Sequence, residues 1–227
     1  MSVYIETQII MDFLAAGETY HIFNHAVGKD NLFQNEDNYR YFLKRYAYYI
    51  GPIAETYAYC LMPNHFHILL TIKPEQALAS FFNLSDLQGL LDLEGLGRKI
   101  GQQFSNFFNS YTKSFNKYHN RRGALFCHNF QRKKVQDDFY FMSLIEYIHR
   151  NPVHHGFCEN IMDWYWSSYF ICLNEDIETA FSSRQKIFEL YGGKTAFIQK
   201  HQSGLNNYWD LAINEDYSDF ISIRCAK

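Results

Sequence analysis

An alternating segment, His65–Ile72, constrains the fold more than any other feature of the sequence. Successive side chains of a strand point to opposite faces. One face of this segment therefore carries Phe66, Ile68, Leu70 and Ile72, and the other carries His65, His67, Leu69 and Thr71. The strand-prone segment Ala54–Met62 precedes it, and Pro63-Asn64 breaks the pattern between the two. We therefore expect a hairpin whose apolar face covers a core and whose opposite face holds two histidines side by side.

Patterns on both sides of this hairpin predict an α+β fold. They indicate a strand at Thr19–Val27, a helix from an N-cap at Asn35 to Gly51-Pro52, a long amphipathic helix at Arg98–Tyr118, a short strand within Leu125–Val135, and a helix from Asp137 or Asp138 to about Asn151, where Pro152 ends it. The order strand, helix, strand, strand, helix, strand, helix suits a ferredoxin-like sandwich, in which helices pack against a mainly antiparallel sheet.

Composition is that of an ordinary globular chain. The 227 residues are 47% hydrophobic and 20% charged, which excludes disorder and low complexity. No apolar run reaches the roughly 18 residues of a membrane helix, and the N-terminus lacks the basic start of a signal peptide, so we expect a cytoplasmic protein without a membrane partner. We expect one domain over residues 1–170 and an acidic C-terminal extension over 171–227, with a helix at Arg184–Tyr191. Residues 74–97 indicate a helical connection with a Leu- and Gly-rich insertion.

Positive charge is concentrated in one segment. Nine Lys or Arg and no Asp or Glu lie between Arg98 and Lys134, whereas the rest of the chain has twelve basic and 24 acidic residues. These charges favour a site for a polyanion, although a solvated helix face would show the same charges. The candidate contacts are Lys113, Lys117 and Arg121, four residues apart on the predicted long helix, followed by Arg122, Arg132, Lys133 and Lys134.

The two histidines of the alternating strand are candidate metal ligands. Imidazoles at i and i+2 on one strand face emerge in parallel and can bind a single ion. Buried or solvated structural histidines would give the same pattern, so this signal depends on its context. A second cluster, Cys158 with His154 and His155, does not indicate zinc, because no fourth ligand has suitable spacing.

The helix predicted after Asp137 supplies that context. Tyr147 lies beside its apolar stripe rather than in the centre, and Asn151 follows four residues later, so that the phenol and the amide oxygen can face one point. Arg150 lies on the same flank. A boundary tyrosine with a hydrogen-bonded hydroxyl would occupy the same position. Further along, Trp164, Tyr165 and Trp166 either stack on unpaired bases or are buried.

Two strings together resemble a known family. Met62-Pro-Asn-His-Phe-His67 and Tyr147-Ile-His-Arg-Asn-Pro-Val153 are similar to motifs of the single-tyrosine HUH transposases, above all the REP-associated tyrosine transposases of bacteria. Flanking pieces agree in order, from Tyr20–His25 in the first strand to the Trp-Ser-Ser element within Asp163–Tyr169, with the basic turn Asn116–Phe126 between them. The stretch around Phe82–Gly97 and the tail after Ile171 depart from the family pattern. These departures bear on the substrate specificity that the resemblance implies, and not on the core chemistry.

The resemblance implies a ferredoxin-like HUH fold and a role for each motif residue. His65, His67 and Asn151 would bind Mg²⁺ or Mn²⁺, and Tyr147 would be the nucleophile. Tyr147 would attack a DNA phosphorus and expel a 3′-hydroxyl, and the resulting 5′-phosphotyrosine would store the bond for rejoining. The partner would be DNA that is single-stranded or forms a hairpin, with the basic residues named above contacting its phosphates and Arg150 helping to position the strand. Relatives include monomers and homodimers, so either state is compatible with the resemblance.

Two other functions remain open at this point. A domesticated descendant would bind hairpin or repeat DNA as a regulator without cutting it, although His65, His67, Tyr147 and Asn151 are all present. A metal-dependent hydrolase would use Tyr147 only to orient water, and would keep cutting after its replacement by Phe.

Overall fold

The computed structural model describes residues 13–84, 93–127, 129–174 and 183–203. Its centre is a four-stranded antiparallel sheet in the order β2-β3-β1-β4. This order and the connections between its strands make the split βαββαβ arrangement, so the predicted ferredoxin-like α+β sandwich is confirmed. The strands are β1 (Thr19–His25), β2 (Ala54–Met62), β3 (His65–Ile72) and β4 (Gln131–Lys134).

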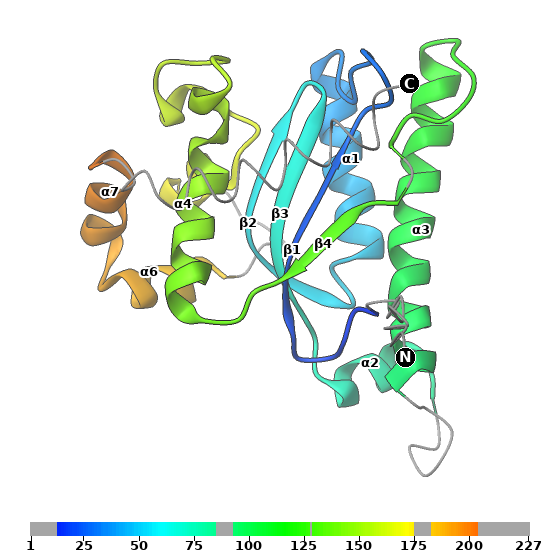
Figure 1. Cartoon of the computed structure of the whole chain (residues 1–227), viewed down its shortest axis with the longest axis horizontal. Coiled ribbons are helices and arrows are strands. Elements are labelled where there is room, and N and C mark those ends of the chain that lie inside the picture. The colour runs from blue at the N-terminus through cyan, green and yellow to red at the C-terminus, as the bar shows by residue number, and fades with distance from the viewer. Residues whose placement is uncertain (1–12, 85–92, 128, 175–182, 204–227) are drawn as a thin grey trace, which may run out of the picture.

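Helices cover both faces of the sheet (Figure 1). The two helices of the split motif lie on one side, and a second set lies on the other. The first side has α1 (Glu36–Tyr49) and α3 (Leu93–Tyr118), with the short α2 (Glu75–Phe81) before α3; the second has α4 (Asp138–His154), α6 (Arg184–Tyr191) and α7 (Lys194–Gln202). Two short elements, η1 (Ile161–Asp163) and α5 (Ser168–Leu173), follow α4.

Local signals explain where the two main helices begin. The Asn35 side chain accepts a hydrogen bond from the backbone N–H of Asn38 at 3.1 Å, and Asp137 accepts one from Tyr140 at 2.7 Å. Each bond satisfies an N–H group that the first helical turn leaves unpaired. Both expected N-caps are thus confirmed, and the cap of α4 fixes the start of the helix that carries Tyr147.

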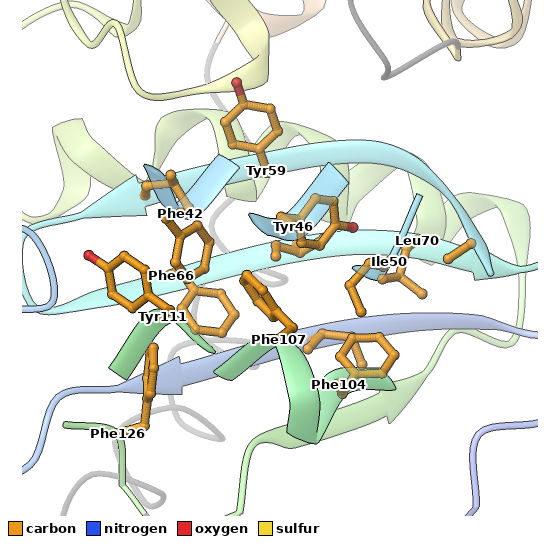
Figure 2. Packing of buried hydrophobic residues seen from close by; sticks show 14 of the residues in the cluster. Phe42, Tyr46, Ile50, Tyr59, Phe66, Leu70, Phe104, Phe107, Tyr111 and Phe126 are labelled. Atoms are coloured by element: carbon orange, nitrogen blue, oxygen red, sulfur yellow. The ribbon is translucent and has the colours of Figure 1, made fainter. Parts of the chain in front are cut away.

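The main core lies between the sheet and the α1/α3 layer. Figure 2 shows Phe42 and Tyr46 from α1 meeting Phe107 from α3 over Phe66 and Leu70 of β3. The predicted apolar face of β3 therefore covers this core. A second cluster packs α4 against the opposite face of the sheet and includes Cys60, Leu69 and Tyr147. Because both faces of β3 are covered, its histidine face is buried as well.

The Trp-Ser-Ser element closes one edge of the sheet. The Leu61 N–H donates to the Trp166 carbonyl at 2.9 Å, the Tyr59 N–H donates to Ser168 Oγ at 2.8 Å, and Cys60 forms a bridge with Ser167. These bonds satisfy backbone groups of the edge strand β2 that would otherwise template pairing with another chain. The strand at the opposite edge, β4, is short and basic, and both properties disfavour pairing with another chain.

Some boundaries differ from the prediction. Helix α3 begins at Leu93 instead of Arg98, and α4 runs through Pro152 to His154. A proline in the last turn removes one backbone hydrogen bond, and the His155 N–H still donates to the Asn151 carbonyl at 3.0 Å, so the helix continues. Tyr118, the last residue of α3, is 62% exposed.

The chain after α5 packs onto α4. The Tyr191 hydroxyl donates to the Met142 carbonyl at 3.0 Å, and His201 on α7 lies 2.9 Å from His149 on α4. The helix expected at Arg184–Tyr191 is present. Residues 85–92 of the expected insertion and residues 175–182 and 204–227 of the expected extension lie outside the described residues, and the domain division at residue 170 stays a prediction. Among helices in the described ranges, none has the length and apolarity needed to cross a membrane.

Candidate active site

The strand register gathers several histidines on one face of the sheet. In the antiparallel pair of β1 and β3, His25 lies opposite His65, and Phe23 lies opposite His67. Residues that are directly opposite each other share a face, so His21, two positions before Phe23, lies on this face too. His65 and His67 are side by side with ring centroids 5.4 Å apart. The expected histidine pair is therefore present, on the face that α4 covers.

Helix α4 places Tyr147 directly over this face. Its ring centroid lies 5.5 Å from that of His67 in an edge-to-face arrangement, and 6.4 Å from that of His21. Tyr147 is completely buried. The flank position predicted from the stripe is buried because it faces the sheet. The structure thus brings the candidate nucleophile to the candidate ligands.

Asn151 lies one helical turn after Tyr147 and meets the other histidine. Its Oδ1 atom is 3.3 Å from Nε2 of His65, and the residue is fully buried. Nδ1 of His65 lies 2.7 Å from the side-chain oxygen of Asn64. A neutral imidazole carries one ring proton, and the shorter contact to Asn64 assigns that proton to Nδ1, which leaves Nε2 as an acceptor. Two acceptors, Nε2 and Oδ1, therefore face each other.

Burial keeps these imidazoles neutral. It lowers the pKa of His65 and that of His67 well below the usual value, and neighbouring imidazoles lower both further. His21 is similar: burial, with Lys133 nearby, lowers its pKa to about 3. The deprotonated ring is the form that binds metal ions, so the environment selects the ligand form at neutral pH.

The donor set suits a divalent cation. Among the described residues no group of three or more His, Cys, Asp or Glu side chains is arranged to hold a metal, so any ion here would need the Asn151 amide besides His65 and His67. The facing acceptors of His65 and Asn151 repel each other, and a cation bound by both would relieve that repulsion. Two imidazoles and one carboxamide oxygen are ligands that Mn²⁺, Mg²⁺ or zinc can accept.

His155 marks the place where this buried site meets solvent. Its ring centroid is 4.8 Å from that of His65, yet His155 itself is exposed. His25 also stacks on His65, with parallel rings 5.7 Å apart. His65, His67, Tyr147 and Asn151 are all nearly or fully buried, so a DNA phosphate reaches them only when covering side chains move aside.

The basic residues do not form one surface. Lys133 lies opposite His21 in the sheet and therefore on the face of the candidate site, whereas Arg132 and Lys134 lie opposite Ile22 and Tyr20, on the face of the α1/α3 core. The exposed Lys113 and Lys117 are on α3, in the layer opposite α4 (Figure 1), and Arg122 is exposed in the turn that follows.

Three residues predicted as DNA contacts, Arg121, Arg150 and Lys134, are engaged within the protein. Arg121 forms an ion pair with Asp30 and also donates to the Ala124 carbonyl at 2.7 Å. Arg150 donates to the His201 carbonyl at 2.9 Å, which joins α4 to α7. Lys134 pairs with Glu18 at 2.9 Å, at an exposed position where the ion pair competes weakly with a phosphate.

Sequence reasoning missed the second layer of histidines. His21, whose Nε2 is 2.9 Å from Nδ1 of His67, belongs to β1, and His149 and His201 form another buried pair at 2.9 Å. Period-two alternation of β1 already places His21 and His25 on one face. What the sequence does not contain is the pairing of β1 with β3, which brings that face to His65 and His67.

The fold agrees with that of the class that the motifs resemble, the single-tyrosine HUH transposases. No family model matches the chain. A putative REP-associated tyrosine transposase of Haemophilus influenzae is 28% identical over 115 residues, which is 51% of this chain and 58% of that protein. Among solved structures, a REP-associated tyrosine transposase bound to a REP hairpin has a TM-score of 0.50 and 16% identity, covering 79% of this chain and 90% of the other. The resemblance to the REP-associated tyrosine transposases is confirmed.

Proposed function

We propose that the chain is a transposase-like DNA-strand transferase. It would bind, nick and rejoin single-stranded DNA of hairpin or repeat-associated type through a metal-assisted 5′-phosphotyrosine intermediate. The proposal rests mainly on how α4 lies over β3. The ring centroids of Tyr147 and His67 are 5.5 Å apart, and Oδ1 of Asn151 is 3.3 Å from Nε2 of His65. One helix thus places the candidate nucleophile and the candidate third ligand over one strand.

Comparison and charge support DNA as the partner. A solved structure with this fold, that of a REP-associated tyrosine transposase, is bound to a REP hairpin. Lys133 lies on the face of the candidate site, and Lys113, Lys117 and Arg122 are exposed elsewhere. A DNA strand that extends beyond the reacting phosphate could contact these separate cations through its other phosphates. Such contacts fix the position of the DNA without reading its sequence.

His65, His67 and Asn151 would hold the divalent cation, Mg²⁺ or Mn²⁺. When bound, the ion supplies positive charge that polarises the scissile phosphate and stabilises the leaving oxygen. The chain prepares this site: Asn64 fixes the proton of His65 on Nδ1, so that Nε2 presents its lone pair on the side of Asn151.

Tyr147 would perform the covalent step. Its phenolic oxygen forms a bond to phosphorus, the bond from phosphorus to the 3′-oxygen breaks, and the phenolic proton is lost as the 3′-hydroxyl gains one. The 5′-phosphotyrosine retains the energy of the phosphodiester, so the same 3′-hydroxyl or another can reverse the step. A phenol has an ordinary pKa of about 10, so only about one in a thousand is ionised at neutral pH, and proton removal must accompany attack.

The test compares strand cleavage by the wild-type protein with that by Tyr147→Phe. Labelled hairpin oligonucleotides that tile both flanks of the gene are incubated with Mg²⁺ or Mn²⁺ and resolved on denaturing gels. Tyr140→Phe, on the same helix, is the control and should cut normally. Loss of cutting only in Tyr147→Phe supports the transferase. Cutting that survives in Tyr147→Phe indicates a hydrolase, and hairpin binding without cutting in the wild type indicates a domesticated regulator.

A further inference from the structure

A short strip of aromatic rings leads from the candidate metal ligands to the surface. His155 contacts His65, with ring centroids 4.8 Å apart, and the ring of Phe157 follows 6.5 Å from that of His155. The next ring, Trp164, lies 5.6 Å from Phe157. His155 is exposed and Phe157 is 41% exposed, so the strip begins at the buried site and presents apolar ring surface to solvent.

The end of α4 fixes the position of Phe157. Gly156 has a φ of +69°, in the left-handed region, and its N–H donates to Val153 at 3.0 Å, while the Phe157 N–H donates to Pro152 at 2.8 Å. These two bonds are those of a Schellman motif, which commonly has an apolar residue at the position of Phe157. Any apolar side chain would satisfy the motif, so the motif alone does not explain an aromatic ring.

Trp164 gives the strip a rigid base. Its indole Nε1 donates to the Leu61 carbonyl at 3.0 Å, at the end of β2 where the next residue, Met62, pairs with His65. The strip is thus anchored to the strand pair that carries the candidate ligands. A partly exposed ring on a fixed base loses little conformational freedom when a second ring stacks on it.

We propose that Phe157, with His155 and Trp164 beside it, is a stacking site for one unpaired base of the DNA strand. The inference rests on the proposed function, because it assumes that the scissile phosphate is bound beside Tyr147. The base nearest that phosphate then lies next to His155, the ring that separates the buried ligands from solvent. Aromatic side chains bind unpaired bases through their π faces, with little preference for sequence.

A binding cycle tests the proposal. Affinity for hairpin oligonucleotides with an unpaired flank is measured by fluorescence anisotropy in EDTA, where no strand is cut, with one abasic nucleotide moved along the flank. Phe157→Leu keeps an apolar side chain for the Schellman motif but removes the π face, and Phe157→Trp keeps the π face. Phe139→Leu, at the exposed start of α4, is the matched control.

We expect Phe157→Leu to bind the intact flank about 10-fold more weakly, and Phe157→Trp and Phe139→Leu to bind as the wild type does. At one abasic position, the difference between the wild type and Phe157→Leu should disappear. An equal loss on every oligonucleotide, or no loss on any, would overturn the proposal. Because the measurement needs no cleavage, failure of Tyr147 to cut would leave its outcome unaffected.

Discussion

Nε2 of His21 lies 2.9 Å from Nδ1 of His67, with both rings buried between the sheet and α4. One of these nitrogens must donate to the other. If His67 donates, its Nε2 has a lone pair and can bind a cation; if His21 donates, the proton of neutral His67 is on Nε2 and blocks binding. His21 would therefore act as a positioning residue that selects the metal-binding tautomer of His67.

Replacing His21 by Phe should weaken Mn²⁺ binding about 10- to 100-fold, because the ring volume stays while the acceptor is lost. His21→Gln, which retains a carbonyl acceptor, should recover part of the affinity. Titration calorimetry and a thermal melt would separate this loss from unfolding. Wild-type Mn²⁺ affinity in a folded His21→Phe protein would show that the contact has no role in orienting His67.

Removal of a ligand should separate chemistry from DNA binding. His65→Ala should abolish metal-dependent cleavage but leave most of the hairpin affinity measured in EDTA, since the basic residues remain. His25→Ala is a matched control, because His25 stacks on His65 and is also buried but is not a proposed ligand. Parallel loss of cleavage and of binding in His65→Ala would instead indicate that the histidine pair is structural.

Neighbouring lysines on β4 should contribute unequally to DNA binding. Lys133 lies on the face of the site, whereas Lys134 lies on the other face and pairs with Glu18. Lys133→Ala should weaken binding to all sequences and reduce the slope of log affinity against log salt by about 1, and Lys134→Ala should change it less. Salt titrations of both variants on one oligonucleotide test this. Equal slopes in both variants and the wild type would contradict it.

Acid should destabilise the packing of α7. Burial lowers the pKa of His201 to about 4, although its hydrogen bond to the Phe197 carbonyl opposes that shift. The groups that face His201 are His149 and Arg150 from α4, Tyr169 from α5 and Tyr191 from α6. The unfolded chain then takes up the proton first, so the free energy of unfolding falls as the pH drops from about 6.5 to 4.

For His201 alone this loss amounts to about 3 kcal/mol over the whole interval. His201→Gln cannot titrate, so its denaturant-derived stability should depend less steeply on pH than that of the wild type. If the two proteins have parallel stability profiles between pH 7 and 4, His201 does not take up this proton on unfolding.

Much of this fold follows from local sequence patterns. Alternation defined β3 from His65 to Ile72, and the N-caps Asn35 and Asp137 marked two helix starts. Position along α4 was also enough to group Tyr147 with Asn151, because helical periodicity determines which residues share a face. These predictions depend on residues close in sequence, where the backbone geometry is nearly constant.

Contacts between distant segments could not be predicted in this way. The register of β1 against β3, which brings His21 to His67, depends on packing over the whole sheet. The same holds for Arg150, predicted as a DNA contact but engaged with the His201 carbonyl. Basic residues adjacent in sequence were treated as one patch, although alternation in β4 places Arg132 and Lys133 on opposite faces.

The central claim is that Tyr147 becomes covalently linked to DNA, and mass spectrometry of the trapped product tests it most directly. The full chain is incubated with hairpin DNA and Mn²⁺, denatured, and digested with protease and nuclease. We predict a peptide containing Tyr147 whose mass is increased by a 5′-linked nucleotide, absent in EDTA and in Tyr147→Phe. Strand cleavage without any such peptide, or a nucleotide attached to another residue, would contradict the account.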